Sequence, residues 1–185
     1  MQILPLTIPD VRLITPEIHR DERGYFSESF NRETFREIQI DVEFVQDNIS
    51  LSLVPGVLRG LHFQVSPFAQ HKLIQVLRGR IFDVAVDIRR GSSTYGQHVE
   101  MELGPEEGHQ IFVPIGFAHG FVTLEPETEV FYKVSSYYSP EHDRGIHWND
   151  PRLEIEWPID SKDVVVSEKD SRNPPLAEID DYFTM

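Results

Sequence analysis

The stretch that decides the fold is VLRGLHFQVSPFAQHKLIQVLRGRIFDVAVDI, residues 57–88. It holds two apolar-rich runs joined through residues 77–80, LRGR, a short glycine-containing turn that predicts a β-hairpin. In the second run, apolar residues at the even positions from 82 to 88 alternate with Asp83 and Asp87. A period of two is typical of a strand with one face on a core and the other on something polar.

The same stretch carries a heavy load of polar side chains. Leu61 and Phe63 flank His62, so a regular strand turns His62 away from these two apolar neighbours. The polar residues of this region are Arg59, His62, Gln64, Lys72, Asp83 and Asp87. A surface strand could carry them without any function, whereas histidine, lysine and carboxylate pointing into a barrel mouth would form a proton-transfer site.

Length and composition favour a single all-β domain spanning residues 1–185. The chain has 11 glycines, 13 prolines and 11% aromatic residues, and helical periodicity is scarce. We expect about ten to twelve strands with few short helices, the pattern of a double-sheet jelly roll. We expect this domain to include an N-terminal arm and a C-terminal tail.

The charge of the chain restricts its partners. A formal net charge of −14 argues against nucleic-acid binding, which needs clustered Lys and Arg. A small anionic ligand needs only a few cations, and several arginines are available: Arg23, Arg59, Arg78, Arg80, Arg89 and Arg90. The absence of cysteine excludes disulfides and thiolate chemistry. No secretory signal and no apolar stretch of about 20 residues is visible, so we expect a soluble cytoplasmic protein without membrane contact.

The N-terminal third predicts an arm, a turn and a short helix. Residues 1–20 mix short apolar runs with prolines, which fits an edge strand or an arm. Residues 21–30, DERGYFSESF, predict a turn followed by an aromatic patch, read either as a plain hairpin or as a place to hold a base or phosphate. Asn31 can cap a helix over residues 31–40.

Further strands are expected at residues 42–53, 97–103, 110–113 and 130–138. In the first of these, Gln46 and Asn48 lie two residues apart, so both amides share one face. In the last, Tyr132 shares a face with Val130 and Val134.

A catalytic metal is disfavoured by the histidine pattern. The run PxGxxH at residues 114–119 is similar to the second motif of the cupin superfamily, whose metal-binding members supply a histidine there. The first motif of those members needs a His-x-His pair and a downstream carboxylate. Here His62 is followed by Phe63 and Gln64, and residues 68–71 read FAQH. We therefore expect no metal and no cofactor, and a metal-dependent cupin such as a dioxygenase stays a disfavoured alternative.

General acid–base chemistry is the candidate that remains. The chain has no HExxH, GxSxG, Walker or Rossmann motif. If His62 and Tyr132 point into the same barrel from different strands, they could face a ligand from two sides. The alternative is that His62 is a packed structural residue.

Long blocks of the chain closely resemble the dTDP-4-dehydrorhamnose 3,5-epimerase family. The blocks are RGLHFQ at 59–64, QHKLIQVLRGRIFDVAVDIR at 70–89, PIGFAHGF at 114–121, YKVSSYYSPEHDRGIHWNDP at 132–151 and DERGYFSESF at 21–30. The resemblance keeps the same order from about residue 1 to residue 176.

This resemblance implies a metal-free, cupin-type jelly roll that forms a homodimer. The implied reaction is epimerisation of dTDP-4-dehydro-6-deoxy-D-glucose at C3 and C5, giving dTDP-4-dehydro-L-rhamnose. Both carbons flank the C4 ketone, so a base can remove either proton to form an enolate, and an acid can return a proton to the opposite face.

The resemblance also implies roles for particular residues. His62 would be the base, with Asp170 orienting it and stabilising its imidazolium; Asp83 is the alternative partner. Tyr132 would be the acid on the other face of the sugar. Lys72 would stabilise the enolate oxygen at C4.

Further residues match substrate-binding positions. Those matching the diphosphate or sugar are Arg23, Arg59, His119 and Lys169. Those matching the surroundings of the thymidine are Phe26, Glu28, Gln46, Asn48 and Tyr138. Asp143 stands where the family has glutamate, in a further substrate contact. In the family, Arg23, Phe26 and Glu28 reach the neighbouring subunit's site.

Two other readings stay open. A non-catalytic nucleotide-sugar-binding module is disfavoured by the joint presence of His62, Tyr132 and Lys72. Relatives on antibiotic-sugar pathways epimerise one carbon only, and the outcome depends on the placement of Tyr132 and the pose of the sugar.

Overall fold

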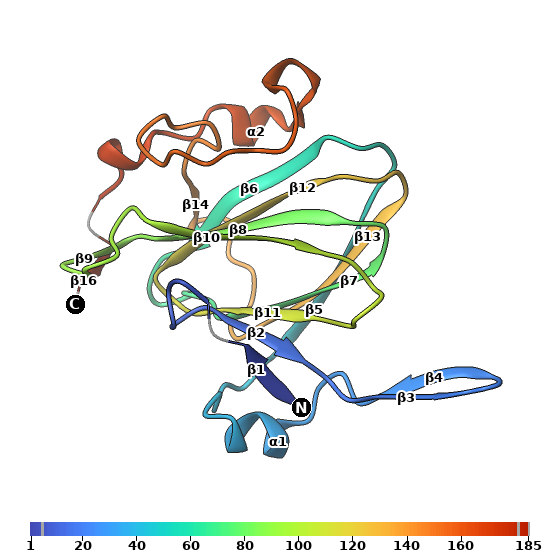
Figure 1. The fold of residues 1–185 in the computed structure, drawn as a ribbon. Coiled ribbons are helices and arrows are strands. Elements are labelled where there is room, and N and C mark those ends of the chain that lie inside the picture. The colour runs from blue at the N-terminus through green and yellow to red at the C-terminus, as the bar shows by residue number, and fades with distance from the viewer. Residues whose placement is uncertain (5, 181, 185) are drawn as a thin grey trace.

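The computed structural model describes residues 1–4, 6–180 and 182–184, and most of its strands form two sheets (Figure 1). In order across the first sheet these are β1 (Gln2–Leu4), β2 (Arg12–Thr15), β11 (Gln110–Val113), β7 (Lys72–Arg78), β13 (Thr128–Val134) and β5 (Gln46–Ser52). Across the second sheet they are β10 (His98–Leu103), β8 (Ile81–Asp87), β12 (Phe117–Thr123), β6 (Val57–Gln64) and β14 (Asp143–Gly145), with β15 (Val165–Val166) pairing β6. The expected all-β, cupin-type double-sheet jelly roll is confirmed.

Short elements complete the fold. An arm is formed by the hairpin of β3 (Ile18–Asp21) and β4 (Gly24–Ser27), and a two-strand pair by β9 (Arg89–Arg90) and β16 (Phe183–Thr184). The helices are α1 (Arg32–Glu37) and α2 (Glu168–Ser171), with 3-10 turns at Ser161–Asp163 and Leu176–Glu178. Among the described residues, no helix is long and apolar enough to cross a membrane.

Three apolar cores hold these layers together. The inner core lies between the two sheets and contains Ile74 from β7 and Phe121 from β12. The outer core lies between the second sheet and the C-terminal segment, which contributes Trp148 and Leu176. A third core packs Phe35 of α1 against the first sheet. The second sheet is thus covered on both faces, and every residue of β8 is buried.

The alternation in β8 separates two different environments. Phe82, Val84 and Val86 belong to the outer core beneath the C-terminal segment. Asp83 and Ala85 lie on the opposite face, toward the space between the sheets. The apolar face predicted from the period of two is therefore the outer one, and the polar face looks inward.

The predicted hairpin at residues 77–80 is wrong. β7 lies in the first sheet and β8 in the second, so this turn carries the chain from one sheet to the other. Gly79 has φ +73, and a Cβ there would come within 2.3 Å of Thr128 Oγ1. Arg80 binds Glu106 and Glu125 at 3.2 and 3.6 Å. A tight turn constrains only local backbone geometry, so it does not decide which strand the next segment pairs with.

Two predicted strands are shorter in the structure, and the short helix is confirmed. The strand expected over residues 42–53 begins at Gln46, and the one over 130–138 ends at Val134. Beyond Val134, the carbonyl of Ser136 accepts a hydrogen bond from Gln70 Nε2 at 2.8 Å. Side chains of neighbouring segments thus bind this backbone in place of the strand-to-strand hydrogen bonds of the sheet. The cap Asn31 Oδ1 accepts from Glu33 N at 3.0 Å.

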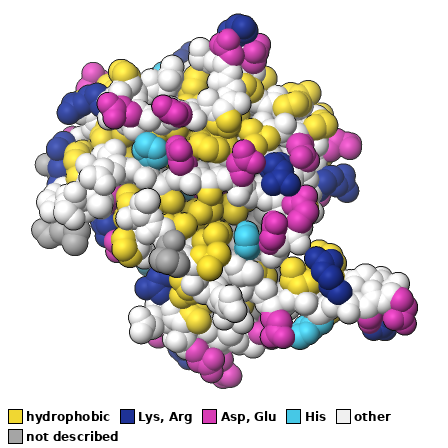
Figure 2. Space-filling model, viewed as in Figure 1, with side chains coloured by type: hydrophobic (Ala, Val, Ile, Leu, Met, Phe, Trp, Pro, Cys, Tyr) yellow, Lys and Arg dark blue, Asp and Glu magenta, His cyan; other side chains and the backbone are white. Residues whose placement is uncertain are grey.

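The β3–β4 arm extends away from the two sheets (Figure 1). Its turn is stabilised by Arg23 N, which donates to Asp21 Oδ1 at 2.9 Å. Tyr25 and Phe26 on this arm are 65% and 70% exposed. Figure 2 shows acidic and basic side chains together at the tip of the arm, and acidic side chains scattered over the visible face of the body.

Candidate active site

A cavity of 460 Å³ opens between the sheets, beside β6, β7, β12 and β13 and the segment that leads into α2. The residues predicted from the sequence that line it are Arg59, His62, Lys72, His119, Tyr132, Lys169 and Asp170. The structure therefore gathers all four candidate catalytic side chains around one space.

His62 and Asp170 form a hydrogen-bonded pair. The alternation of β6 places Leu61 and Phe63 in the outer core, so His62 lies on the cavity face, as predicted. Its Nε2 lies 2.6 Å from Asp170 Oδ1. Asp170 is 4% exposed. Burial raises the pKa of Asp170, but the hydrogen bond and charge of His62 outweigh this effect, so the pKa lies below its usual value.

Asp170 reaches His62 through the local structure of the C-terminal segment. β15 pairs in parallel with the start of β6, with Val165 opposite Val57. Ser167 then caps α2, because its Oγ accepts a hydrogen bond from Asp170 N at 3.0 Å. The pattern Ser-x-x-Asp at 167–170 is a helix-start signal that could have pointed to this turn.

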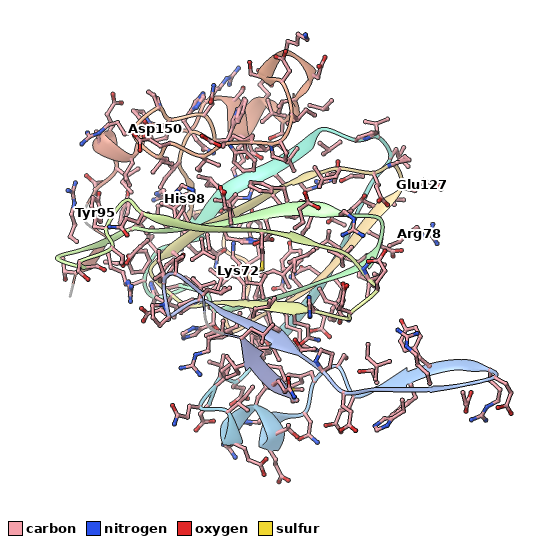
Figure 3. The ribbon with its side chains drawn as sticks, viewed as in Figure 1. Lys72, Arg78, Tyr95, His98, Glu127 and Asp150 are labelled. Atoms are coloured by element: carbon pink, nitrogen blue, oxygen red, sulfur yellow. The ribbon has the colours of Figure 1, made fainter. Side chains whose placement is uncertain are left out.

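Lys72 is a partly buried ammonium group at the start of β7. It lies between the two sheets (Figure 3), and its Nζ donates to the carbonyl oxygen of His62 at 3.1 Å. Burial lowers the pKa of Lys72 to about 8, although the charges of Asp143 and Asp83 act in the opposite direction. Lys72 therefore still carries a positive charge at neutral pH.

Tyr132 reaches the cavity from β13 and packs on the inner core. Burial raises the pKa of its phenol, and the charge of Asp143 adds to this while Arg59 acts against it. The hydroxyl is therefore protonated at neutral pH and can donate a proton.

His119 lies on β12 directly opposite His62 on β6. Its Nε2 lies 2.8 Å from Asp83 Oδ2, so Asp83 partners His119 and Asp170 partners His62. Close packing of glycines brings the two strands together here. A Cβ on Gly120 would come within 2.9 Å of the Cα of Gly60.

A second polar group lies on the loop after β13 and on neighbouring strands. Gln46 Nε2 donates to Asn48 Oδ1 at 2.8 Å, and Gln46 Oε1 accepts from Tyr138 N at 3.0 Å. The hydroxyl of Tyr138 donates to Asp143 Oδ2 at 3.2 Å, and the same oxygen accepts from Lys169 Nζ. Because Lys169 lines the cavity, it connects this group to the catalytic candidates.

Three predicted residues lie away from the cavity. Arg23 and Phe26 belong to the β3–β4 arm, and Glu28 follows it. Arg23 forms an ion pair with Asp21. Glu28 Oε2 accepts from Asn31 Nδ2 at 3.1 Å. None of these three side chains is among the described residues that line the cavity.

The sequence-based reasoning missed part of the cavity wall. The additional lining residues include Ser50, Ile74, Phe121, Val165, Val166 and Ser167. Ile74 and Phe121 lie two residues after Lys72 and His119, so strand alternation alone could have placed them on the cavity face. Val165 and Val166 carry no comparable signal, because their position depends on pairing with a strand over 100 residues earlier.

Comparison with known proteins agrees with this geometry. The family model described as dTDP-4-dehydrorhamnose 3,5-epimerase matches residues 5–178. The dTDP-4-dehydrorhamnose 3,5-epimerase of Sinorhizobium fredii is 53% identical over 179 residues, covering 97% of this chain and 91% of the relative.

Solved structures are similar over nearly the whole chain. The Legionella pneumophila dTDP-6-deoxy-D-glucose-3,5-epimerase in complex with dTDP-4-keto-L-rhamnose has a TM-score of 0.92 and 46% identity, covering 97% of this chain and 94% of that one. A 3'-monoepimerase from Streptomyces bikiniensis in complex with dTDP-quinovose is more distant, at 32% identity and a TM-score of 0.86 over 94% and 87% of the chains. The chain thus belongs to the dTDP-4-dehydrorhamnose 3,5-epimerase family, whose activity it shares in dTDP-rhamnose biosynthesis.

Proposed function

We propose that His62, Tyr132, Lys72 and Asp170 carry out the epimerisation of dTDP-4-dehydro-6-deoxy-D-glucose at C3 and C5. The observation that carries this assignment is the His62–Asp170 hydrogen bond of 2.6 Å at the wall of a cavity that Tyr132 and Lys72 also line. A base, an acid and a fixed cation around one space are what proton exchange beside a ketone requires.

The proton follows a balanced route through these side chains. Asp170 accepts from His62 Nε2, which leaves Nδ1 to take a proton from C3 or C5. The C–H electron pair becomes the enolate, and its negative charge develops on the C4 oxygen. The Lys72 ammonium stabilises that charge. Tyr132 gives its proton to the opposite face of the same carbon, after which His62 releases a proton to solvent and Tyr132 takes one back.

Asp170 supports the base in two ways. It holds the ring of His62 with Nε2 protonated, and its negative charge stabilises the imidazolium that forms. Because Asp170 is almost completely buried, little water competes for its hydrogen bond. The orientation of the base is therefore set before the substrate arrives.

The remaining cavity residues suit a nucleoside diphosphate sugar. Arg59, His119 and Lys169 line the cavity and would bind the diphosphate or the sugar. The polar group around Tyr138 would hold the thymidine, with Tyr138 stacking on the base and the amides of Gln46 and Asn48 binding its polar edge. Asp143 is shorter than the glutamate of the family and already accepts from Tyr138 and Lys169, so it would act on the substrate through them.

The proposed assembly is a homodimer in which each arm completes the partner's site. Arg23, Phe26 and Glu28 lie outside their own cavity on or beside an extended arm (Figure 1). The edge strand β5 exposes the apolar side chains Ile49 and Leu51, 64% and 50% accessible, which a second copy would cover. The expected cytoplasmic location stays a prediction.

Incubation with dTDP-4-dehydro-6-deoxy-D-glucose in D2O tests the assignment. We expect deuterium at both C3 and C5, measured by NMR and mass spectrometry, and its loss in His62→Ala. Tyr132→Phe should reduce complete epimerisation by roughly 100-fold or more while the proton abstracted by His62 still exchanges.

Two other outcomes would contradict the proposal. Incorporation at one carbon only would make the chain a one-carbon epimerase, like the more distant 3'-monoepimerase structure. Unchanged exchange in a folded His62→Ala variant would remove His62 as the base. No incorporation by the wild type, with binding of dTDP intact, would favour a non-catalytic binding module.

A further inference from the structure

A buried carboxylate outside the proposed proton route is only half satisfied. Asp83 on β8 is 0% exposed. Its Oδ2 accepts from His119 Nε2 at 2.8 Å, whereas Oδ1 has no hydrogen-bond partner among the described residues. Burying a carboxylate with an unfilled acceptor costs free energy, so a purely structural role for Asp83 is unfavourable.

The contact with Asp83 determines which nitrogen His119 offers to the cavity. An ionised carboxylate can only accept hydrogen bonds, so Nε2 of His119 carries a proton. The other nitrogen, Nδ1, is then left for the cavity that His119 lines. Because His119 lies opposite His62 across the β6–β12 pairing, Asp83 orients the ring that faces the proposed base.

Asp83 on the inward face of β8 and Lys72 on the cavity face of β7 both lie toward the space between the sheets, so the carboxylate can act on the ammonium. Burial lowers the pKa of Lys72 to about 8, and the negative charge of Asp83 opposes that effect, as does Asp143, while Lys169 adds to it. At a pKa this close to neutrality, a lost carboxylate changes the charged fraction of the ammonium at working pH.

Asp143 is the second carboxylate that acts on Lys72, and its charge raises the pKa of the ammonium more than that of Asp83 does. The other ionisable groups on the cavity wall are Arg59, His62, His119, Tyr132, Lys169 and Asp170. On the neighbouring strand β10, the residue opposite Asp83 is the apolar Met101, and the flanking Glu100 and Glu102 are exposed. On β12 the residue opposite is Phe121. Asp83 is thus the buried carboxylate on this side of the cavity among the described residues.

We propose that Asp83 is a positioning residue of the active site, which holds His119 with Nδ1 toward the sugar and keeps the Lys72 ammonium charged beside the C4 oxygen. The part concerning Lys72 rests on the function proposed above. A single buried charge would in this way prepare two groups that contact the substrate, without touching the substrate itself.

The test is the pH dependence of kcat in Asp83→Asn, which keeps the side-chain volume and removes the charge. We expect kcat to fall. We also expect the alkaline limb of its pH profile, the decline in kcat as Lys72 loses its proton, to move to lower pH by on the order of one unit. The matched control is Asp87→Asn. Asp87 lies four residues along the same strand face, is also buried, and accepts hydrogen bonds from Arg89, Ser92 and Thr94. This control variant should have a lower free energy of unfolding, and its kcat should decline over the same alkaline pH range as that of the wild type.

Two results would overturn the proposal. One is a folded Asp83→Asn variant whose kcat and alkaline limb match the wild type. The other needs no variant: ¹⁵N chemical shifts of the wild-type His119 ring should show the proton on Nε2, and a proton on Nδ1 alone would contradict the proposed orientation.

The readouts separate this proposal from the proposed function. If Lys72→Arg leaves the alkaline limb unchanged, the role of Lys72 fails, while the ring tautomer of His119 still tests Asp83 independently. If Lys72→Arg removes the limb and Asp83→Asn does not move it, the proposed function stands and the action of Asp83 on Lys72 fails.

Discussion

At the scale of single residues, burial gives Lys72 a pKa of about 8. The ammonium is charged below that pH and loses its charge as the pH rises through it. Stabilisation of the enolate should therefore weaken on the alkaline side. A phenol does not account for the same limb, because the pKa of Tyr132 is raised from its ordinary value of 10.0.

Replacing Lys72 tests this reasoning directly. Lys72→Arg keeps a cation that stays charged throughout this pH range, so the fall in kcat near pH 8 should disappear even if the rate is lower. Lys72→Met removes the cation and should lower kcat by roughly 100- to 1,000-fold. Rates across the neutral and alkaline range give both answers; an unchanged limb in Lys72→Arg would assign it to another group.

Asp87 provides a residue-scale prediction about stability. Burial raises its pKa, but hydrogen bonds from Arg89, Ser92 and Thr94 outweigh this and lower it from 3.8 to about 2. Because the pKa of Asp87 is lower in the folded than in the unfolded chain, its ionised form stabilises the fold at pH values above the unfolded pKa. This stabilisation is lost as the pH falls from about 4 through about 2. Its size is about 2 kcal/mol.

Urea unfolding of Asp87→Asn should therefore show a free energy of unfolding lowered by about 2 kcal/mol at neutral pH. The difference from the wild type should shrink in acid, where the wild-type carboxyl becomes protonated. An equal loss at both pH values would mean that the charge of Asp87 contributes nothing.

Several single residues could be placed from the sequence because strand alternation is a local rule. His62 faces away from Leu61 and Phe63 as predicted, and Gln46 and Asn48 share a face. The choice between Asp83 and Asp170 as partner of His62 could not be made in this way. Asp170 lies 108 residues from His62, and the pairing of β15 with β6 brings the two segments together.

At the scale of elements, the contact between β6 and β12 sets the distance between the two cavity histidines. The strands approach closely because Gly60 and Gly120 face each other. A Cβ on Gly120 would come within 2.8 Å of the Arg59 carbonyl oxygen. An added Cβ on either glycine would meet backbone atoms of the facing strand, which cannot move aside as a flexible side chain can.

Gly120→Ala should separate these strands, lowering the free energy of unfolding by about 1 to 3 kcal/mol and reducing kcat more than it raises KM. Gly104→Ala is the matched control, since its added Cβ meets only side-chain atoms of Glu106 and Arg80. Thermal unfolding and steady-state rates measure both effects. Wild-type activity in Gly120→Ala would show that the strand spacing does not matter for catalysis.

Local sequence patterns could not predict which strands pair, nor where each strand ends. The turn after β7 could be predicted from Gly79, but its consequence, a change of sheet, could not. Pairing is decided by which apolar faces meet, and both β7 and β8 carry faces that fit the inner core. The end of β13 at Val134 was missed for a similar reason, because side chains of other segments, such as Gln70, bind the following loop.

At the scale of the whole molecule, the proposed homodimer predicts that each active site uses the β3–β4 arm of the partner subunit. Arg23→Ala and His62→Ala should each be nearly inactive alone. A heterodimer of the two, co-expressed with different tags, would contain one site with an intact His62 and an intact partner arm. Its rate should therefore reach about half of the wild-type rate per dimer.

The control for this experiment is Arg20→Ala, a neighbouring arm cation that lies over Tyr25 at 5.5 Å. Combined with His62→Ala, it reports any general effect of altering the arm. If the Arg23→Ala and His62→Ala heterodimer stays inactive while both variants remain dimeric, Arg23 does not act in the cavity of the partner subunit.

The hydrogen bond between His62 and Asp170 also links activity to the completeness of the chain. The base is made early during synthesis and its carboxylate 108 residues later. A protein shortened before β15 would keep the strands that carry His62, Lys72 and Tyr132, but it would lose Asp170 and Lys169, so its histidine would be left without the group that orients it. Such a fragment would hold nucleotide sugar and release it unchanged, so turnover itself reports that the final segment has docked.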